Sequence, residues 1–491
     1  LQRGQNMQND TIAAIATPPG LGGIAILRLS GPDARTVLSA LFSPPEKSRT
    51  AGTFAFRPRH MHHGHALDRD GHPLDEVLAV YMPGPGSATG EDVGEIHCHG
   101  GAGVTAALLE AALAAGARLA GPGEFTRRAF LNGRLDLAQA EAVAELISAP
   151  TREGARLAAA KLDGSLSRAV TDLRSSLDAL RIQVTLAVDF PDEEAELLDR
   201  EAFASTAACG RKRIRVLLEA FERARLWSEG ALAVLAGKVN AGKSSLLNAL
   251  LGRPRAIVSD KPGTTRDYIE ESINLKGLPL RLTDTAGLRE ESEDVESEGI
   301  RRTHGLAAEA DILLLVADLG LPPGPDEYEF FRQHGQALHQ QRLLLVLNKT
   351  DLAPAEAADQ WRSRLIDNAP EALAHDLSLC PCFPVSARTG EGLDALAEGM
   401  RQAIAGSASG GTAGSPLQTG GDAAPNLRQS HLLRQADDEL AALEQALTDK
   451  HPPDILSVHL EAAAACLDEV TGSTDNEELL DRIFSSFCIG K

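Results

Sequence analysis

The stretch GKVNAGKSS, Gly237–Ser245, fits the pattern G-x-x-x-x-G-K-[ST] and comes directly after the apolar run ALAVLA. A buried strand that leads through such a loop into a helix is the setting in which this pattern binds phosphates. Backbone amides wrap the phosphate groups, and the helix N-terminus adds its positive end. Lys243 is expected to reach the β- and γ-phosphates and Ser244 to ligate Mg²⁺. The predicted phosphate-binding residues are Asn240, Ala241, Gly242, Lys243, Ser244 and Ser245.

Two further motifs follow the phosphate loop in the order expected of a nucleotide hydrolase. GTTRD provides Thr265, which is predicted to complete the Mg²⁺ shell and to sense the γ-phosphate. DTAG follows the strand-like run LPLRLT, and the Asp284 carboxylate is expected to hold the metal through water, while the Gly287 amide faces the γ-phosphate. Thr264, Thr265, Asp284, Thr285, Ala286 and Gly287 therefore join the predicted nucleotide site.

The motif NKTD, Asn348–Asp351, predicts which base is bound. The Asp351 carboxylate can accept hydrogen bonds from guanine N1–H and from the 2-amino group. Adenine offers neither donor in that arrangement and would leave the carboxylate unpaired, so guanine is strongly favoured. Ser386 and Ala387 of VSARTGEG are expected to lie behind the base. The predicted base-side residues are Asn348, Lys349, Asp351, Ser386, Ala387 and Arg388.

Composition limits what else the chain can be. Its 491 residues exceed one hydrophobic core, and its net charge of −21 argues against a surface coated with basic groups for nucleic acid, although not against a local patch. The six cysteines form no disulfide framework, which favours free thiols in a reducing, cytoplasmic compartment. The longest apolar runs, such as ILLLVA and RLLLVLN, fall short of the ~20 residues that a membrane span needs and predict buried parallel strands.

Periodicity divides the rest of the chain. Residues 11–125 mix strand-like runs with Gly and Pro turns and one helix near 103–115, which predicts an α+β domain within 1–125. Residues 126–230 and 426–491 show helical seams and predict two parts of one bundle. A Ras-like α/β domain is predicted at 231–405 between them, and 406–425 is a Gly/Ser-rich linker. The seam residues are Leu166, Val170, Leu173, Leu177, Leu180 and Val184, then Leu433, Ala436, Leu440, Leu443 and Leu447, and then Leu456, Leu460 and Leu467.

GKVNAGKSSLLNALLG, KPGTTRD, DTAGLRE and the closing FSSFCIGK together resemble the MnmE (TrmE) family of tRNA-modification GTPases. TPPGLGGIAILRLSG, TGEDVGEIHCHGG and GPGEFTRRAFLNGRLDLAQAEAVAELI resemble it too, so the resemblance spans nearly the whole chain. It implies an N-terminal folate-binding domain that dimerises, a discontinuous helical domain and an inserted GTPase domain. It also implies a heterotetramer with an FAD-carrying MnmG-type partner that installs an aminomethyl-type group, such as carboxymethylaminomethyl, on C5 of the tRNA wobble uridine. The carbon would come from a tetrahydrofolate derivative, of the 5,10-methylene or 5-formyl type.

The resemblance also implies how water attack is arranged. Leu288 stands where many GTPases carry a glutamine that orients the water. In the family a potassium ion takes an arginine finger's place, and Asn240, Ser259, Lys261 and Thr264 match its ligand positions. Glu296 matches the water-positioning carboxylate, and Arg289 and Arg266 match supporting positions. Lys261 and Ser259 depart from the family pattern, in which an apolar residue and threonine are common.

A second site is implied by the same resemblance. Arg28, Glu95, Arg134 and Lys491 match the family's folate contacts, and Cys488 in the tail FCIGK would lie beside the one-carbon unit or the uridine. Basic groups suit the glutamyl carboxylates of folate, and Glu95 can accept from the pterin's N–H donors.

Several alternatives compete with these predictions. A ribosome-assembly GTPase that binds rRNA as a nucleotide switch shares the nucleotide motifs, as does a non-enzymatic nucleotide-gated scaffold. HMHHGH, His60–His65, suggests a metal cluster, but a solvated turn is the preferred interpretation. In HCH, a strand would place His97 and His99 on one face and Cys98 on the other, which favours a strand edge over a zinc site.

Overall fold

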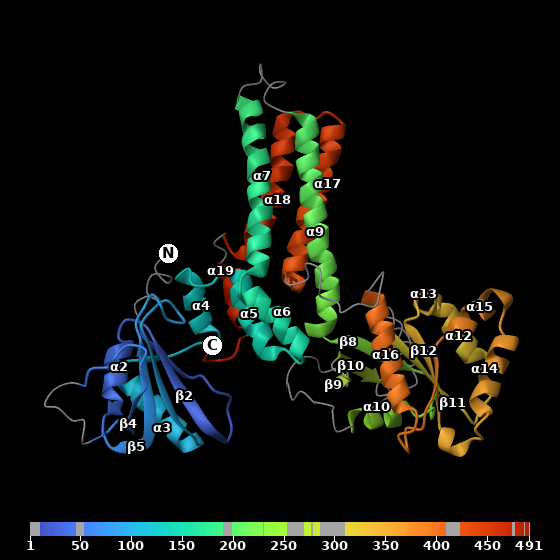
Figure 1. Ribbon diagram of the computed structural model, residues 1–491, viewed down its shortest axis with the longest axis horizontal. Coiled ribbons are helices and arrows are strands. Elements are labelled where there is room, and N and C mark those ends of the chain that lie inside the picture. The colour runs from blue at the N-terminus through green and yellow to red at the C-terminus, as the bar shows by residue number, and fades with distance from the viewer. Residues whose placement is uncertain are drawn as a thin grey trace, which may run out of the picture. The chain divides into compact units, whose positions relative to one another are not determined.

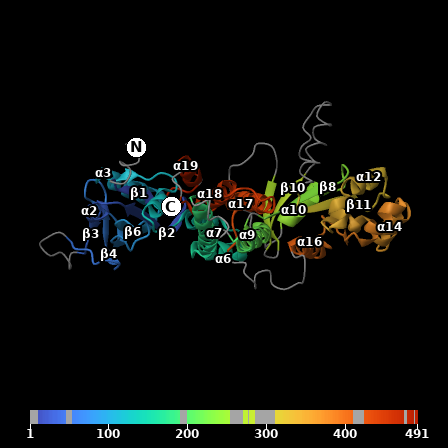
Figure 2. The same ribbon diagram turned by 90° about the horizontal axis from the view of Figure 1, so that it is seen from above.

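A computed structural model describes residues 10–45, 54–189, 199–228, 230–252, 270–275, 278–284, 310–408, 423–473, 477–485 and 487–490. The chain forms two compact units. The first comprises Leu1–Ala144, Lys161–Arg211 and Gln435–Lys491, and the second comprises Glu145–Ala160 and Lys212–Arg434. Figures 1 and 2 show the elements in two views at right angles. The predicted α/β domain at 231–405 lies wholly within the second unit.

The first unit contains a seven-stranded sheet of order β3-β4-β5-β6-β2-β1-β7. Its strands are β1 (Ile12–Ile15), β2 (Gly22–Ser30), β3 (Phe42–Ser43), β4 (His62–Leu67), β5 (Pro73–Met82), β6 (Val93–Gly100) and β7 (Arg118–Leu119). Only β1 and β7 pair in parallel. Helices α2 (Ala34–Ala40) and α3 (Ala102–Ala114) pack Leu38 and Leu108 into one core with Leu27 and Ile96 of the sheet. This is the α+β arrangement that the sequence predicted.

Helices follow the sheet along the chain (Figure 1). Their predicted apolar seams are buried. The helices are α4 (Glu124–Leu131), α5 (Leu137–Ser148), α6 (Arg152–Leu162), α7 (Ser165–Asp189), α9 (Arg200–Ser228), α17 (Leu427–Thr448), α18 (Pro453–Thr471) and α19 (Glu477–Ser485). Helices α7 and α18 lie side by side, joined by an ion pair of 2.9 Å from Arg174 Nε to Asp468 Oδ1. Each leucine buried along these seams contributes about 1.5–3 kcal/mol relative to exposure.

A six-stranded sheet of order β13-β12-β11-β8-β10-β9 forms the centre of the second unit. Its strands are β8 (Ala231–Ala236), β9 (Glu270–Leu275), β10 (Leu278–Asp284), β11 (Ile312–Asp318), β12 (Leu343–Asn348) and β13 (Cys382–Pro384). All neighbours pair in parallel except β9, which runs antiparallel to β10 at the edge. Every residue of β8 and of β12 is buried, which confirms the prediction of buried parallel strands from apolar runs.

Helices cover both faces of this sheet and explain that burial. Helices α10 (Lys243–Leu251) and α16 (Leu393–Ala408) form one core with Ala231, Ala233 and Leu235 of β8. The alternate residues Leu232 and Val234 belong to the core on the other face. That face is covered by α12 (Pro325–Gln333), α13 (Gly335–His339), α14 (Ala357–Asp367) and α15 (Glu371–Leu379). The carboxyl ends of β8, β11 and β12 therefore share one edge, where open α/β sheets bind their ligands.

The preferred interpretation of His60–His65 as a turn is wrong. Strand β4 begins at His62, and Gly64 lies so close to β3 that a Cβ would overlap the Ser43 carbonyl oxygen and the Phe42 ring. The His62 ring packs edge-on against Phe54, with centroids 5.1 Å apart. HCH does form part of a strand, β6, with Cys98 buried and His99 exposed.

Within the described ranges, no helix combines the length and the apolar character needed to cross a membrane.

Candidate guanine-nucleotide site and a second site at the N-terminal sheet

The phosphate-binding loop connects β8 to α10, and its backbone is left-handed at three positions. These are Gly237 (φ +137°), Asn240 (φ +65°) and Gly242 (φ +92°). A Cβ at Gly237 would overlap the Val316 carbonyl oxygen, so only glycine fits where the loop leaves the sheet. Asparagine tolerates positive φ better than most residues, which explains Asn240. The Asn240 side chain is exposed and accessible to a ligand of the loop.

Lys243 begins α10 and is buried beneath the loop. Its Nζ donates hydrogen bonds to the carbonyl oxygens of Gly237 at 2.8 Å and Lys238 at 2.9 Å. The ammonium group is thus held at the loop by the loop's own backbone, where its charge can act on a phosphate. Ser244 and Ser245 follow in the first helical turn with exposed side chains, and Ala241 is buried.

Asn348, at the carboxyl end of β12, joins the phosphate loop to the base side. Its Nδ2 donates to the Ala241 carbonyl oxygen at 2.9 Å, and its Oδ1 accepts from the Ala387 N–H at 3.0 Å. The side chain is only 2% exposed, so both bonds are shielded from water. A Cβ on Gly242 would overlap Asn348 Nδ2, so the glycine is also required for this contact. Asn348 therefore organises the loops rather than only lining the base pocket.

Asp351 lies in a short 3-10 turn, η4 (Thr350–Leu352), beside the Ser386 loop. Its carboxylate accepts from Ser386 Oγ at 2.6 Å and pairs with Arg388 Nη2 at 2.5 Å. The hydrogen bond from Ser386 is the largest cause of the lowered pKa of Asp351, and the charge of Arg388 adds to it. Asp351 is therefore ionised at neutral pH, which is the form that accepts two hydrogen bonds from guanine.

Lys349 adopts a positive φ of +71° and reaches across to β11. Its Nζ lies 2.7 Å from Oδ2 of Asp318, the last residue of that strand. The sequence interpretation missed Asp318. Its position at the carboxyl end of a parallel strand, level with Asn348 in the next strand, was a signal that could have found it.

The remaining predicted nucleotide residues lie mostly outside the described part of the chain. Asp284 ends β10 opposite Leu235 of β8, which brings its backbone to the edge where the phosphate loop starts. Outside the described residues are Ser259, Lys261, Thr264, Thr265, Arg266, Thr285, Ala286, Gly287, Arg289 and Glu296. The predicted positions of the potassium shell, of the water-positioning carboxylate and of Thr265 therefore stay predictions.

In the first unit, Arg28 of β2 and Glu95 of β6 face each other across the sheet. Arg28 Nε and Glu95 Oε1 are 2.9 Å apart, and the other Glu95 oxygen lies 3.2 Å from His97 Nε2. The Arg28 guanidinium also lies over the Phe125 ring, 5.9 Å from its centroid. Two of the predicted folate contacts are thus brought together, paired with each other. The sequence did not single out His97 and Phe125 for this pair, although His97 stands two residues from Glu95 on the same strand face.

The C-terminal tail returns to this sheet. The Cys488 carbonyl oxygen accepts from the Gly123 N–H at 3.3 Å, and Ile489 forms an antiparallel bridge with Pro122. Gly490 (φ +91°) lies against β1, where a Cβ would be 2.6 Å from the Ile15 carbonyl oxygen. Ile15 pairs with Leu27, so the tail ends against β1, the strand next to the one that carries Arg28.

The structure describes no contact between the other predicted residues of this second site and the Arg28–Glu95 pair. The Cys488 thiol is exposed, and Lys491 lies outside the described residues. Arg134 follows α4 with an exposed side chain, and its backbone N–H donates to the Ala129 carbonyl oxygen at 2.8 Å. Among the described contacts, none links the Arg134 side chain to Arg28 or Glu95.

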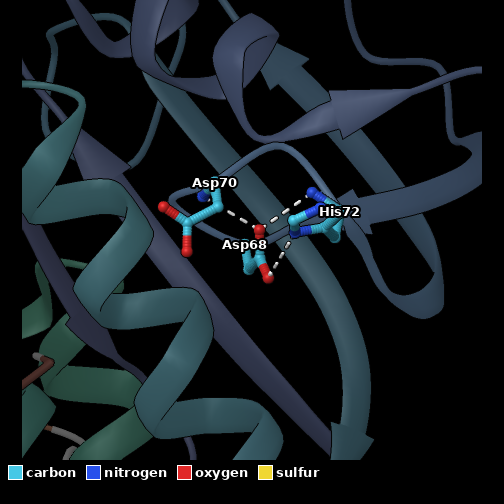
Figure 3. Close-up of side chains that lie close together, drawn as sticks. All are labelled: Asp68, Asp70 and His72. Atoms are coloured by element: carbon cyan, nitrogen blue, oxygen red, sulfur yellow. Dashed lines mark hydrogen bonds and ion pairs between the residues drawn. The ribbon is translucent and has the colours of Figure 1, made fainter.

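Figure 3 shows Asp68, Asp70 and His72 in the turn between β4 and β5. Within the described ranges, these three side chains are close enough together to be considered as metal ligands. Asp68 Oδ1 accepts from the backbone N–H groups of Asp70 at 2.9 Å and His72 at 2.8 Å. The Asp68 carboxylate therefore closes the turn, a common role of aspartate in loops.

The chain matches two family models and several full-length relatives. Residues 11–134 match the family described as the GTP-binding protein TrmE N-terminus, and residues 137–488 match the MnmE helical domain. A tRNA modification GTPase MnmE from Nitratidesulfovibrio vulgaris (strain DP4) is 52% identical over 98% of this chain and 99% of its own. Proteins of the same name from Symbiobacterium thermophilum (43% identical) and Lawsonia intracellularis (41%) cover 99% and 98% of this chain and 100% of their own. The chain therefore belongs to the MnmE family of tRNA modification GTPases.

Proposed function

We propose that this protein hydrolyses GTP and couples the hydrolysis to modification of tRNA. The observation that carries the proposal is the base side of the nucleotide site. An ionised Asp351 is presented by Ser386, and Asn348 ties the same region to the phosphate loop. Guanine has two N–H donors on one edge that match this carboxylate. The names of relatives that align over nearly the full length of the chain support tRNA as the object of the reaction.

The proposal also specifies the chemical group that is added to the tRNA. With an FAD-dependent partner of the MnmG type, the protein installs a carboxymethylaminomethyl-type group at C5 of the wobble uridine, using carbon from a methylene-tetrahydrofolate. A homodimer in the cytoplasm, joined by the partner into a heterotetramer, would carry this out. Support comes from the pairing of Arg28 with Glu95 and from the return of the Cys488 tail to the same unit, at Pro122 and Gly123. Arg28 has N–H donors beyond the Nε that contacts Glu95, and these suit a folate carboxylate.

At the nucleotide site, different residues have different roles in hydrolysis. Lys243 and the loop amides bind the phosphates, and Asp351 fixes the base, so the γ-phosphate is held for in-line attack. Ser244 and Thr265 would hold Mg²⁺, and the exposed Ser244 hydroxyl and Asn240 carboxamide are donors of the hard, oxygen type that Mg²⁺ and K⁺ prefer. Bound cations supply charge that stabilises the transition state. Glu296, assisted by Arg289 and Arg266, would orient the water.

The proposal is tested by mass spectrometry of tRNA nucleosides from cells that lack this protein. Loss of the modified wobble uridines, restored by a plasmid copy, is the expected result. Wobble uridines that remain fully modified in the deletion strain would refute the proposed function. A phosphate-loop variant, Lys243→Ala, used as the complementing copy, then shows whether nucleotide binding is required.

Replacing Asp351 with asparagine should weaken GTP binding about 10- to 100-fold, the scale of one or two hydrogen bonds to a charged group. The amide can instead donate to the 2-oxo group of xanthine, so xanthosine triphosphate should bind the variant better than GTP does. Fluorescent-nucleotide titration measures both affinities. Asp359→Asn is the matched control, because Asp359 is exposed on α14 and is not among the predicted nucleotide-binding residues. Full guanine preference in Asp351→Asn would assign base recognition to another residue.

A further inference from the structure

The tail is received by a turn, Gly121–Gly123, at the start of α4. Gly123 has a φ of +63°, and a Cβ there would lie 2.7 Å from the Phe484 carbonyl oxygen and 2.9 Å from Phe487 Cβ. The backbone of α19 and the tail thus approach this glycine as closely as a side chain would. Phe487 is buried at this contact together with Phe484. The conformation of the turn therefore decides whether the tail can bind.

Glu124, the first residue of α4, holds that turn. Its Oε2 accepts from the Gly121 N–H at 2.7 Å, and its own N–H donates to the Gly121 carbonyl oxygen at 3.3 Å. The carboxylate lies at the N-terminus of α4, where the helix dipole favours negative charge. Its side chain is 7% exposed, unusual for a glutamate unless it is paired.

Two arginines pair with Glu124 and connect it to distant segments. Arg118 of β7 contacts both Glu124 oxygens, at 2.5 and 3.1 Å. Arg128, on the next turn of α4, lies 3.1 Å from Glu124 and continues to Asp10 at 2.5 Å and to Glu91 at 3.2 Å. Arg118 also reaches Asp10, at 2.6 Å. One network, Asp10–Glu91–Arg118–Glu124–Arg128, thereby links β7, α4 and the segments before β1 and β6.

Every acid of this network faces an arginine. Burial alone would raise the pKa of Glu124, but hydrogen bonds from Arg118 and from the Gly121 N–H outweigh it, and the pKa lies below its ordinary value. Asp10 behaves alike: burial opposes ionisation, and hydrogen bonds from Arg118 and Arg128 lower its pKa. Because Glu124 and Asp10 stay ionised at neutral pH, removing either one leaves partly buried arginine charge unpaired, which is costly.

We propose that Glu124 is a positioning residue for the second site: through the Arg118–Arg128 network it fixes the Gly121–Gly123 turn that receives the tail and so holds Cys488 in place. The same residue sets the start of α4, and Phe125, directly after it, supports Arg28. The network therefore fixes the tail and the Arg28 side of the site as one structure. This inference rests on the proposed tRNA modification, in which the tail takes part.

The test uses Glu124→Gln in the full-length protein. Glutamine keeps an acceptor for the Gly121 N–H but sets an uncharged amide against two guanidinium groups. Hydrogen exchange followed by mass spectrometry should show about tenfold faster exchange at the Gly123 amide and in the 484–490 segment, the scale of one lost charge-assisted hydrogen bond. A variant that lacks residues 487–491 gives the exchange of the undocked turn. GTP hydrolysis should change less than about twofold, whereas tRNA modification should fall about tenfold because misplacing one group in a site is costly.

Asp468→Asn is the matched control, because it removes one of the two carboxylates that pair with Arg174 in the same unit and leaves the turn intact. It should leave tail exchange and modification unchanged. Arg118→Lys keeps the charge but loses the bidentate contact with Glu124. It should also speed amide exchange in the tail, by a smaller factor than Glu124→Gln. It serves as the deciding variant if Glu124→Gln fails to fold.

Unchanged tail exchange in Glu124→Gln and Arg118→Lys would overturn the inference, and so would a loosened tail with wild-type modification. The exchange measurement needs no tRNA, so its result stands even if the wild-type protein modifies no tRNA. A wild-type protein that modifies no tRNA would instead overturn the proposed function.

Discussion

GTP turnover is expected to be about ten to a thousand times faster in KCl than in NaCl. A cation that neutralises charge developing between the β- and γ-phosphates replaces an arginine finger, and losing such a stabiliser costs about 1.4–4 kcal/mol. Na⁺ is the smaller ion and would fit the proposed K⁺ shell poorly. Asn240→Ala should erase most of the difference while leaving nucleotide binding largely intact. Steady-state phosphate release in the two salts measures both effects.

Asn240 needs a careful control, because its backbone is left-handed (φ +65°). Alanine is strained in that conformation, whereas glycine adopts it freely. If the carboxamide ligates potassium, Asn240→Gly should lose the salt preference as fully as Asn240→Ala. Asn248→Ala, an exposed asparagine on α10, should keep it. Equal wild-type rates in KCl and NaCl would refute the potassium assignment.

Cys488→Ser should reduce tRNA modification by about 100-fold or more, the scale of removing one group that acts at the reacting atoms. Serine preserves the backbone bond from Gly123 to residue 488, so the tail should still bind and only the thiol is lost. K⁺-dependent GTP hydrolysis should persist, since the nucleotide site belongs to the other compact unit. Modified nucleosides formed in a reconstituted reaction with the partner flavoprotein give the measurement.

Cys209→Ser is the matched control, because Cys209 is also exposed but lies on α9. It should modify tRNA normally. Deleting residues 487–491 should additionally weaken the binding of a tetrahydrofolate derivative in calorimetry. If Cys488→Ser and the deletion both modify tRNA at the wild-type rate, the tail has a structural role only.

The sequence predicted those parts of the fold in which local pattern and burial agree. The apolar runs at 231–236 and 343–348 became fully buried parallel strands, and the seam from Leu166 to Val184 became the buried stripe of α7. The phosphate loop was predictable because phosphate binding requires a particular backbone, and Gly237 and Gly242 supply its left-handed positions. The division into domains 1–125, 126–230, 231–405, 406–425 and 426–491 stays a prediction.

Other features depend on residues that only the fold brings together. Strand β4 lacks large apolar residues at its buried positions, which are Gly64 and Ala66, and the histidines at 62, 63 and 65 suggested a turn. Glu124, Arg118 and Arg128 are charged and would ordinarily be assigned to the surface. Arg128 is buried because it also pairs with Asp10 and Glu91, at sequence separations that no local pattern reports.

The two hydrogen bonds of Asn348 mean that the ends of a nucleotide are recognised cooperatively. One buried carboxamide ties the Ala241 carbonyl to the Ala387 amide, so ordering either loop lowers the entropy lost when the other is ordered. Such coupling is reciprocal, so a phosphate group in the loop and a guanine base beside Asp351 should each raise the affinity for the other. A substitution at Asp351 can therefore change the preferred base by itself. A substitution at Asn348 instead removes the contacts to both loops at once.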